Sequence, residues 1–304
     1  MSIFPARAAR LVVSCFLVSS MAAVGIVAAG TPGDTDLLPP SGRYETPDAW
    51  RRPVEPFRIA DHTWYIGTEG LAALLIDTPQ GAIVLDGGLP QAADLLVANL
   101  RKLGVAPEDV RWLLHSHAHI DHAGPLAALQ RATGARVATN AESAAILARG
   151  GTDDLHFGDG MAFPPVHTDR FVQDGETVHV GDIALVAHFT PGHTPGGLSW
   201  TWTDSRDGKP VRIAYVDSLS APGYKLRGHA RYPRIVEAYR GTFATVRALP
   251  CDVLLTPHPD ASGWTPANTG APHASPMRCS EYADNASRNF EKALAEQDRA
   301  AHAD

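Results

Sequence analysis

The chain of 304 residues has little cysteine and no cluster of it, because its three cysteines are Cys15, Cys251 and Cys279. Zinc sites built from thiolates need closely paired cysteines, so this spacing excludes a structural zinc site of the cysteine type. Basic runs are also missing, and the formal net charge is -7. We therefore expect neither nucleic acid nor an anionic membrane surface as a partner.

Long apolar runs are confined to the N-terminus. Arg7 and Arg10 precede an apolar run from Leu11 to Ala29, which is the pattern of an export signal. A membrane anchor is one alternative, but the run is short for a span and is followed by Gly and Pro. A lipid attached at Cys15 is another. We expect residues 1–29 to be a cleaved signal peptide, which predicts a periplasmic protein without membrane contact after cleavage.

The cysteines that remain after signal cleavage are Cys251 and Cys279. An even pair in an oxidising compartment is most simply a disulfide. It would join a late strand to the C-terminal helical region.

The rest of the chain, residues 30–304, is expected to form a single domain. Its first part, about 30–55, is rich in proline and predicts an extended arm. Apolar and β-branched runs then predict strands followed by helices, and the same order occurs again in the second part. Two sheets packed face to face with helices outside account for this order, so we predict an α/β fold of the four-layer αββα type. A long polar loop separates the halves at about 150–170, and loops of this length are often functional.

The stretch HSHAHIDHAG, residues 115–124, concentrates side chains that bind metals directly after an apolar strand. His117 and His119 lie two residues apart and face the same side of an extended segment. His115 is expected to be structural, as part of the strand that leads to them. Asp121 and His122 then turn toward a neighbouring position. No single flat arrangement directs all four side chains at one ion, so the pattern favours two adjacent ions.

Four side chains do not complete two metal sites, and the best further candidates are His193 in TPGHTPGG and His258 in LLTPHPD. Each follows an apolar strand, so its imidazole is expected at a strand end. Imidazole and carboxylate ligands without a free thiolate suit zinc. The remaining histidines are interpreted as ordinary solvated or hydrogen-bonded residues: His62, His156, His167, His179, His188, His229, His273 and His302.

These motifs resemble those of a known family. The pattern HxHxDH at 117–122, with LDGG at 85–88, PGHTPG at 191–196 and a late PHP, is similar to the metallo-β-lactamase fold superfamily. More narrowly, residues from roughly 55 to 285 resemble subclass B3 metallo-β-lactamases, in the stretches DGGLPQAA, LLHSHAHIDHAGP, ARGGTDDLHFGDG and AYVDSLSAPGY. The long matches are more specific than the superfamily motif, because one scaffold serves many hydrolases.

The resemblance implies two zinc ions and a ligand set for each. One ion would be bound by His117, His119 and His193, and the other by Asp121, His122 and His258. Asp86 would orient a ligand imidazole or the surrounding loop, although its position before two glycines also fits a plain turn residue. The implied activity is hydrolysis of the β-lactam ring of penicillins, cephalosporins and carbapenems by a metal-bridging hydroxide that Asp121 helps to orient, which gives antibiotic resistance.

The resemblance also implies which residues contact the substrate. Ser218 and Ser220 would bind its carboxylate, and Tyr224 would stabilise the developing oxyanion. In the loop near 150–165, Phe157 and Met161 would form an apolar wall. The alternatives are a serine-type turn after a strand for the two serines and core packing for the two apolar residues.

Two other functions remain open at this point. If Asp217 bridged the two metals, the protein would resemble a thioester hydrolase of the glyoxalase II type or a lactonase. A zinc-binding or scavenging protein without catalysis is the third possibility, but it leaves Asp86 and the serine loop unexplained. The chain could be a monomer or a homo-oligomer.

Overall fold

The structure is a computed structural model that describes residues 37–40, 45–267 and 276–302. Residues 35–304 form one compact unit. The expected signal peptide, Cys15 and His273 lie outside the described residues, as does part of the arm. Within the described ranges, no helix combines the length and the apolar character needed to cross a membrane.

The first sheet has seven strands in the order of the sequence. They are β1 (Phe57–Arg58), β2 (Thr63–Tyr65), β3 (Leu74–Thr78), β4 (Gly81–Leu85), β5 (Val110–Leu114), β6 (Arg136–Thr139) and β7 (Arg170–Phe171). Strands β1 to β4 pair antiparallel, and β4 to β7 pair parallel. Leu85 lies opposite Leu114, so the loops that follow β4 and β5 begin side by side at one edge of the sheet.

The second sheet has five strands in the order β12-β11-β10-β9-β8. They are β8 (Thr177–Val180), β9 (Ile183–Phe189), β10 (Leu198–Arg206), β11 (Lys209–Tyr215) and β12 (Val253–Leu255). All neighbours are antiparallel except β11 and β12, which are parallel. Strands β9, β11 and β12 therefore run in the same direction, and the loops that follow them leave from one edge.

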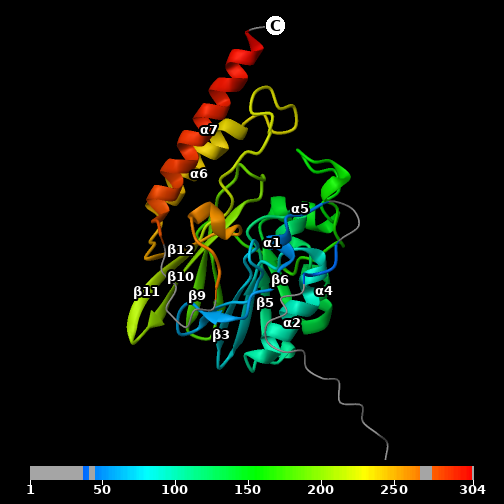
Figure 1. Ribbon diagram of the computed structural model, residues 1–304, viewed down its shortest axis with the longest axis vertical. Helices are drawn as coiled ribbons and strands as arrows, with labels where there is room; N and C mark the ends of the chain where they lie inside the picture. The colour runs from blue at the N-terminus through cyan, green and yellow to red at the C-terminus, as the bar shows by residue number, and fades with distance from the viewer. Residues whose placement is uncertain (1–36, 41–44, 268–275, 303–304) are drawn as a thin grey trace, which may run out of the picture. The chain divides into compact units, whose positions relative to one another are not determined.

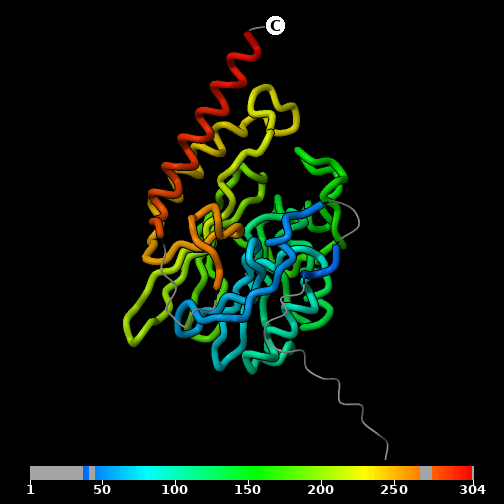
Figure 2. Tube along the Cα trace, viewed as in Figure 1, coloured from blue at the N-terminus to red at the C-terminus, as the bar shows by residue number. Residues whose placement is uncertain are grey.

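Helices cover the outer face of each sheet (Figure 1). The α-helices are α1 (Asp48–Arg51), α2 (Ala93–Lys102), α3 (Ile120–Ala123), α4 (Leu126–Thr133), α5 (Ala141–Ala148), α6 (Ile235–Ala248) and α7 (Cys279–Ala301). Short 3₁₀ turns are η1 (Pro90–Ala92), η2 (Pro107–Asp109), η3 (Asp159–Met161) and η4 (Pro259–Ser262). Asn140 begins α5 by accepting a hydrogen bond from the Ser143 amide at 2.9 Å, as asparagine commonly does at an N-cap. Helices α6 and α7 run side by side (Figure 2).

Three apolar clusters separate four layers. Along β3, Leu74 and Ile76 point into the cluster between the two sheets, whereas Leu75 points into the cluster beneath α2 and α4. A third cluster lies between the second sheet and helices α6 and α7. Successive side chains of a strand point to opposite faces, so strands covered on both faces are apolar throughout. This layering confirms the predicted αββα fold.

The expected extended arm and the expected disulfide have different outcomes. The expectation of an extended arm is wrong for residues 48–51, which form the helical turn α1. Pro47 precedes this turn, and Arg51 pairs with Asp48 at 2.7 Å, a spacing that favours one turn of helix. The expected disulfide between Cys251 and Cys279 is present and joins the segment before β12 to the start of α7.

Candidate metal centre

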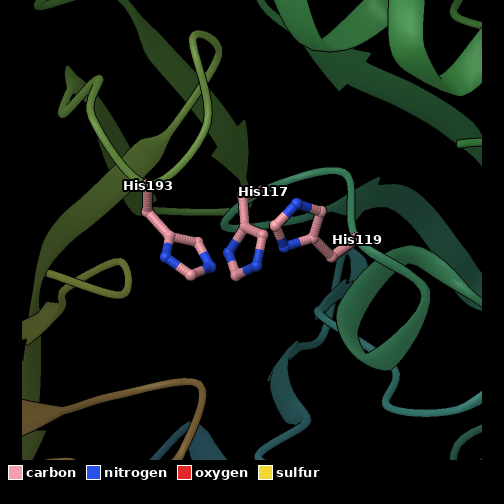
Figure 3. Close-up of side chains that lie close together, drawn as sticks. All are labelled: His117, His119 and His193. Carbon is pink, nitrogen blue, oxygen red and sulfur yellow. The ribbon is translucent and has the colours of Figure 1, made fainter. Parts of the chain in front are cut away.

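The ends of three strands bring the candidate ligands together. His117 and His119 follow β5, and His193 lies in the turn after β9. One ligand atom from each lies within 4.8 Å of the others, and all three residues are buried. Figure 3 shows the three rings facing a common point. His193, which we expected as a distant ligand beside His117 and His119, therefore lies next to them.

A second group lies next to the first and shares His117 with it. His117, Asp121 and His122 also offer ligand atoms within 4.8 Å of one another. His258, which follows β12, completes this group because its Nε2 lies 3.2 Å from His122 Nε2 and 3.4 Å from Asp121 Oδ2. Asp121 Oδ2 is 3.2 Å from His122 Nε2. Donor atoms around a tetrahedral zinc ion are about 3.3 Å apart, so these three separations suit one metal.

The first group is oriented from behind by fixed acceptors. His117 Nδ1 lies 2.8 Å from Asp217 Oδ1, and His193 Nδ1 donates to the Ser220 carbonyl oxygen at 2.8 Å. These bonds place the ring proton on Nδ1 and leave Nε2 free for a metal. His119 Nε2 lies 3.3 Å from Asp154 Oδ2, which leaves Nδ1 as its free nitrogen.

The two groups differ in charge. Burial lowers the pKa of His193 to about 3, and burial together with neighbouring histidines holds the pKa of His117 well below its ordinary value. Burial also opposes charge on His122, but the adjacent Asp121 and Asp86 carboxylates outweigh it and raise the pKa of His122 to about 10. The pKa of Asp121 is well below its usual range, because His122 and His258 outweigh the effect of burial. His117 and His193 in the first group are therefore neutral, whereas an ion pair between His122 and Asp121 forms part of the second group.

The donor set fits a pair of metal ions. His117 Nε2 and Asp121 Oδ1 are buried and have no hydrogen-bond partner among the described residues. Buried polar groups normally have partners, so such atoms need an explanation, and a bound metal supplies it. The described cysteines form the disulfide, which leaves nitrogen and oxygen as ligand atoms. Two buried histidine and aspartate groups are thus consistent with a dinuclear metal site.

Asp86 lies between the two loops that leave β4 and β5. It is fully buried, and its Oδ1 accepts the Ser116 amide at 2.7 Å. Its Oδ2 accepts the Tyr215 hydroxyl at 2.6 Å and lies 3.5 Å from His122 Nδ1. Its backbone φ of 59° is uncommon for a residue other than glycine. Asp86 therefore orients the ligand loop directly and faces a ligand imidazole.

Asp217 lies behind His117. Its Oδ1 accepts the Ser218 amide at 2.7 Å as well as the His117 ring proton. A side chain at position 197 would overlap the Asp217 carboxylate and the Thr190 carbonyl oxygen, so Gly197 makes this placement possible. The two ligand groups found among the described residues do not include Asp217.

The residues expected to contact the substrate lie around this centre at different depths. Ser218 is buried, and Ser220 is exposed. Tyr224 is buried, and its hydroxyl lies 3.4 Å from His193 Nδ1. This contact is with the nitrogen that faces away from the metal position, and the oxyanion role of Tyr224 stays a prediction.

The two apolar residues expected to form a wall lie in different surroundings. Phe157 is 39% exposed, and its ring lies edge-on to His119 at 5.5 Å. Met161 packs against the apolar cluster under α2 and α4. The packing alternative thus describes Met161, and its substrate contact stays a prediction. His115 is buried beside Thr139 Oγ1 at 2.7 Å, and burial lowers its pKa to about 4, as suits a structural histidine.

Sequence reasoning missed a contact between the two loops beside the centre. His156, interpreted as an ordinary histidine, stacks on Tyr224 with ring centroids 3.4 Å apart and planes 4° apart. Arg231 pairs with both carboxylate oxygens of Asp153 at 2.8 Å. Nothing local marks either pair, because the partners are more than sixty positions apart in the sequence.

The arm also reaches the centre, which the sequence did not indicate. The Trp50 ring in α1 lies 5.1 Å from the His258 ring. The Trp50 carbonyl oxygen accepts a hydrogen bond from Thr68 Oγ1 at 3.1 Å, which fixes the arm to the first sheet. A lone tryptophan in a proline-rich segment was the available signal.

Residues 67–207 match the model of the metallo-beta-lactamase superfamily. The chain is 33% identical over 164 residues to a hydroxyacylglutathione hydrolase of Anaeromyxobacter dehalogenans, covering 54% of this chain and 52% of that protein. This chain spans about half the length of the first curated relatives it matches.

Solved structures match over more of the chain. The metallo-beta-lactamase MIM-1 of Novosphingobium pentaromativorans is 40% identical with a TM-score of 0.77, over 84% of this chain and 94% of that one. BJP-1 of Bradyrhizobium japonicum, a subclass B3 metallo-beta-lactamase, is 35% identical with a TM-score of 0.74, over 83% and 98%. The similarity therefore extends over nearly all of these structures.

Proposed function

This chain belongs to the metallo-β-lactamase superfamily and is a metallo-hydrolase of that fold, and on this premise we propose that it hydrolyses the β-lactam ring of antibiotics with two zinc ions. Penicillins, cephalosporins and carbapenems are the proposed substrates, and resistance to them is the proposed outcome. We also propose that the protein works in the periplasm, where the Cys251–Cys279 disulfide is stable.

The observation that carries the proposal is the position of Asp217. In the thioester hydrolase alternative this carboxylate would lie between the metals. Instead it accepts the His117 ring proton at 2.8 Å, and the Ser218 amide donates to the same oxygen. His258 completes the second group through its 3.2 Å and 3.4 Å contacts. This ligand set leaves Ser218 and Ser220 beside the centre as groups for a substrate carboxylate.

Each of the chain's own residues has a defined task in this proposal. His117, His119 and His193 would bind one ion, and Asp121, His122 and His258 the other. When bound, a pair of zinc ions supplies a water-derived nucleophile near neutral pH and polarises a carbonyl oxygen. Asp217, Asp86 and the Ser220 carbonyl group keep the ligand rings in one orientation, so the centre needs little rearrangement before reaction.

The serine loop would bind the substrate. The Ser218 and Ser220 hydroxyls can donate hydrogen bonds to a carboxylate, and Tyr224 stays a neutral donor because burial raises its pKa. Phe157 would contact apolar parts of the substrate beside His119. The exposed position of Ser220 and the partly exposed ring of Phe157 support these tasks.

A thioester hydrolase is the second candidate. It is favoured by the curated relatives, of which several are hydroxyacylglutathione hydrolases. Those matches cover 44% to 62% of this chain, whereas the metallo-beta-lactamase structures cover more than four fifths of it. The lactonase alternative rests on a weaker match of 27% identity.

One assay separates these candidates. The purified protein is tested on a chromogenic cephalosporin and on a glutathione thioester, each with and without a chelator and after zinc is added back. We expect cephalosporin turnover that the chelator abolishes and zinc restores, with little thioester turnover. Turnover of the thioester alone would replace the proposal with the second candidate, and turnover of neither would favour a metal-binding protein without these activities.

A further inference from the structure

A cavity of about 370 Å³ lies between the serine loop and helix α7. Its lining is mainly apolar and comes from both walls: Leu219, Pro222, Tyr282, Ala286, Phe290 and Ala293. Small-molecule pockets typically enclose about 300–1,000 Å³, so this cavity has the size for a ring-sized group rather than a whole ligand.

The loop wall of the cavity is part of the candidate metal centre. The Ser220 carbonyl oxygen accepts hydrogen bonds from His193 Nδ1 at 2.8 Å and from the Tyr239 hydroxyl at 2.7 Å. Two donors from different elements thus fix the backbone at the point where the cavity begins. A group bound there lies against the same segment that orients His193.

The helix wall is equally well fixed. Phe290 lies 4.6 Å from the Tyr239 ring and 5.6 Å from the Phe243 ring, so α7 is packed onto α6 beneath the cavity. Both contacts belong to the apolar cluster under the second sheet. Packing of this kind keeps the wall in place when the cavity is empty.

The last turns of α7 join the two walls at the far end. The Gln297 side chain donates to the Tyr224 carbonyl oxygen at 2.7 Å and accepts the Leu226 amide at 2.9 Å. Arg227 pairs with both carboxylate oxygens of Asp298 at 2.8 and 2.9 Å. The loop cannot close onto the helix without breaking these bonds, so the cavity is a built feature.

The cavity is lined by two segments that also contribute to the candidate metal centre. Ser220 lines it, and the same residue is the proposed partner of the substrate carboxylate. Ala261 lines it from η4, three positions after His258. In a cephalosporin or carbapenem, the ring carbon beside the carboxylate-bearing carbon carries a variable substituent. A carboxylate at Ser220 therefore directs that substituent toward the cavity.

We propose that this cavity is a specificity subsite that binds the apolar substituent next to the substrate carboxylate. The inference rests on the proposed β-lactam hydrolysis and adds a preference to it. Because the lining is apolar and ring-sized, an aromatic substituent gains more from it than a methyl group. The contact is made equally in the bound substrate and in the transition state, so it changes KM rather than kcat.

The test fills the cavity from the helix side. The variant Ala286→Trp is compared with the wild type on two cephalosporins that differ only in this substituent, one with methyl and one with an aromatic ring. We expect KM for the aromatic substrate to rise about tenfold, with kcat for both substrates and KM for the methyl substrate within about twofold of the wild type. Ala293→Leu, a smaller change in the same cavity, should act in the same direction with a smaller effect.

The matched control is Ala295→Trp, on the same helix but outside the cavity lining. It should leave the ratio of the two KM values unchanged. An Ala286→Trp enzyme that treats the two substrates alike, whether both KM values rise or neither does, overturns the subsite. A wild type that hydrolyses neither cephalosporin overturns the proposed function itself, and the two failures are therefore distinct. Turnover of the methyl substrate shows that each variant is folded.

Discussion

The two ligand groups of the metal centre share His117 but are prepared for metal in different ways. In the first group, acceptors from outside the group lie against the non-ligand nitrogens of His117, His119 and His193. In the second group, Asp121, His122 and His258 lie within 3.2–3.4 Å of one another and pair among themselves. The first group is therefore oriented before metal binds, whereas the second is held by contacts that a metal must replace.

The difference extends to burial and charge. His117 and His119 are almost completely buried, but the His258 side chain is 24% exposed beside Trp50. The neutral imidazoles of His117 and His193 are ready to bind a cation, while His122 must first release a proton. This comparison teaches that one dinuclear centre can contain a preorganised site and a site coupled to pH and to the arm.

The largest effect should come from the residue that the two groups share. We expect His117→Ala to lose the first metal, to weaken the neighbouring second metal and to lower kcat/KM by about 10³-fold or more, because bound metal contributes several kcal/mol to the transition state. Metal content of the purified variant and turnover of a cephalosporin measure this. The control is His167→Ala, because His167 is exposed and belongs to neither ligand group. Retention of two full equivalents of zinc would contradict the role of His117 as a ligand.

A smaller and more selective effect is expected at His258. His258→Ala should weaken the second metal by about 100-fold and leave the first within a few fold, since the first group does not contain this residue. Stepwise zinc titration against a competing chelator resolves the two affinities. His179→Ala serves as control because its ring is bonded to Thr177 at the surface. Equal weakening of both sites would remove the division into two groups.

The pH dependence of metal binding should separate the groups further. With the pKa of His122 at about 10 in the metal-free protein, this ring is protonated between pH 6 and 8, and metal binding must displace its proton. Affinity at the second site should then rise about tenfold per pH unit if one proton is released. The pKa of His193 is about 3 and that of His117 is well below its ordinary value, so these two ligands of the first metal have no such proton to lose. Titrations at pH 6, 7 and 8 test this, and equal slopes for the two sites would refute it.

The smallest effect concerns the arm. Trp50→Ala should weaken the second metal by about threefold and leave the first unchanged, because an aromatic contact contributes about 0.5–1.5 kcal/mol beyond its buried area. Phe171→Ala, at the edge strand β7 and 57% exposed, is the matched aromatic control. If both variants bind zinc as the wild type does, the arm covers His258 but does not increase the affinity of the second site for metal.

Local patterns identified the part of the centre that one segment carries. His117, His119, Asp121 and His122 follow β5 so closely that strand geometry and residue spacing suffice to group them. His193 and His258 were weaker candidates and gained weight from the resemblance and from their places at strand ends. Both lie beside the cluster in the structure.

Contacts between residues far apart in the sequence could not be predicted, for a physical reason. Trp50, Asp154 and His156 are ordinary residues in irregular segments, and no periodicity or motif marks their partners. Their partners are His258, His119 and Tyr224, and these come within reach only when the loops after β12, β5 and β11 leave the sheets at neighbouring edges. The helical turn α1 was missed because four residues give no detectable period.

By itself, the sequence determined the layer order of the fold, the chemistry of the metal ligands and the disulfide pair, because strand patterns, residue types and cysteine count are properties of the chain. The sequence resemblance favoured Asp217 behind the ligands, and the tertiary structure gives the contact: Asp217 Oδ1 lies 2.8 Å from His117 Nδ1, outside both ligand groups. That contact depends on the space that Gly197 leaves and on the register of two strands. A sequence pattern contains neither this space nor this register, whereas tertiary packing fixes both.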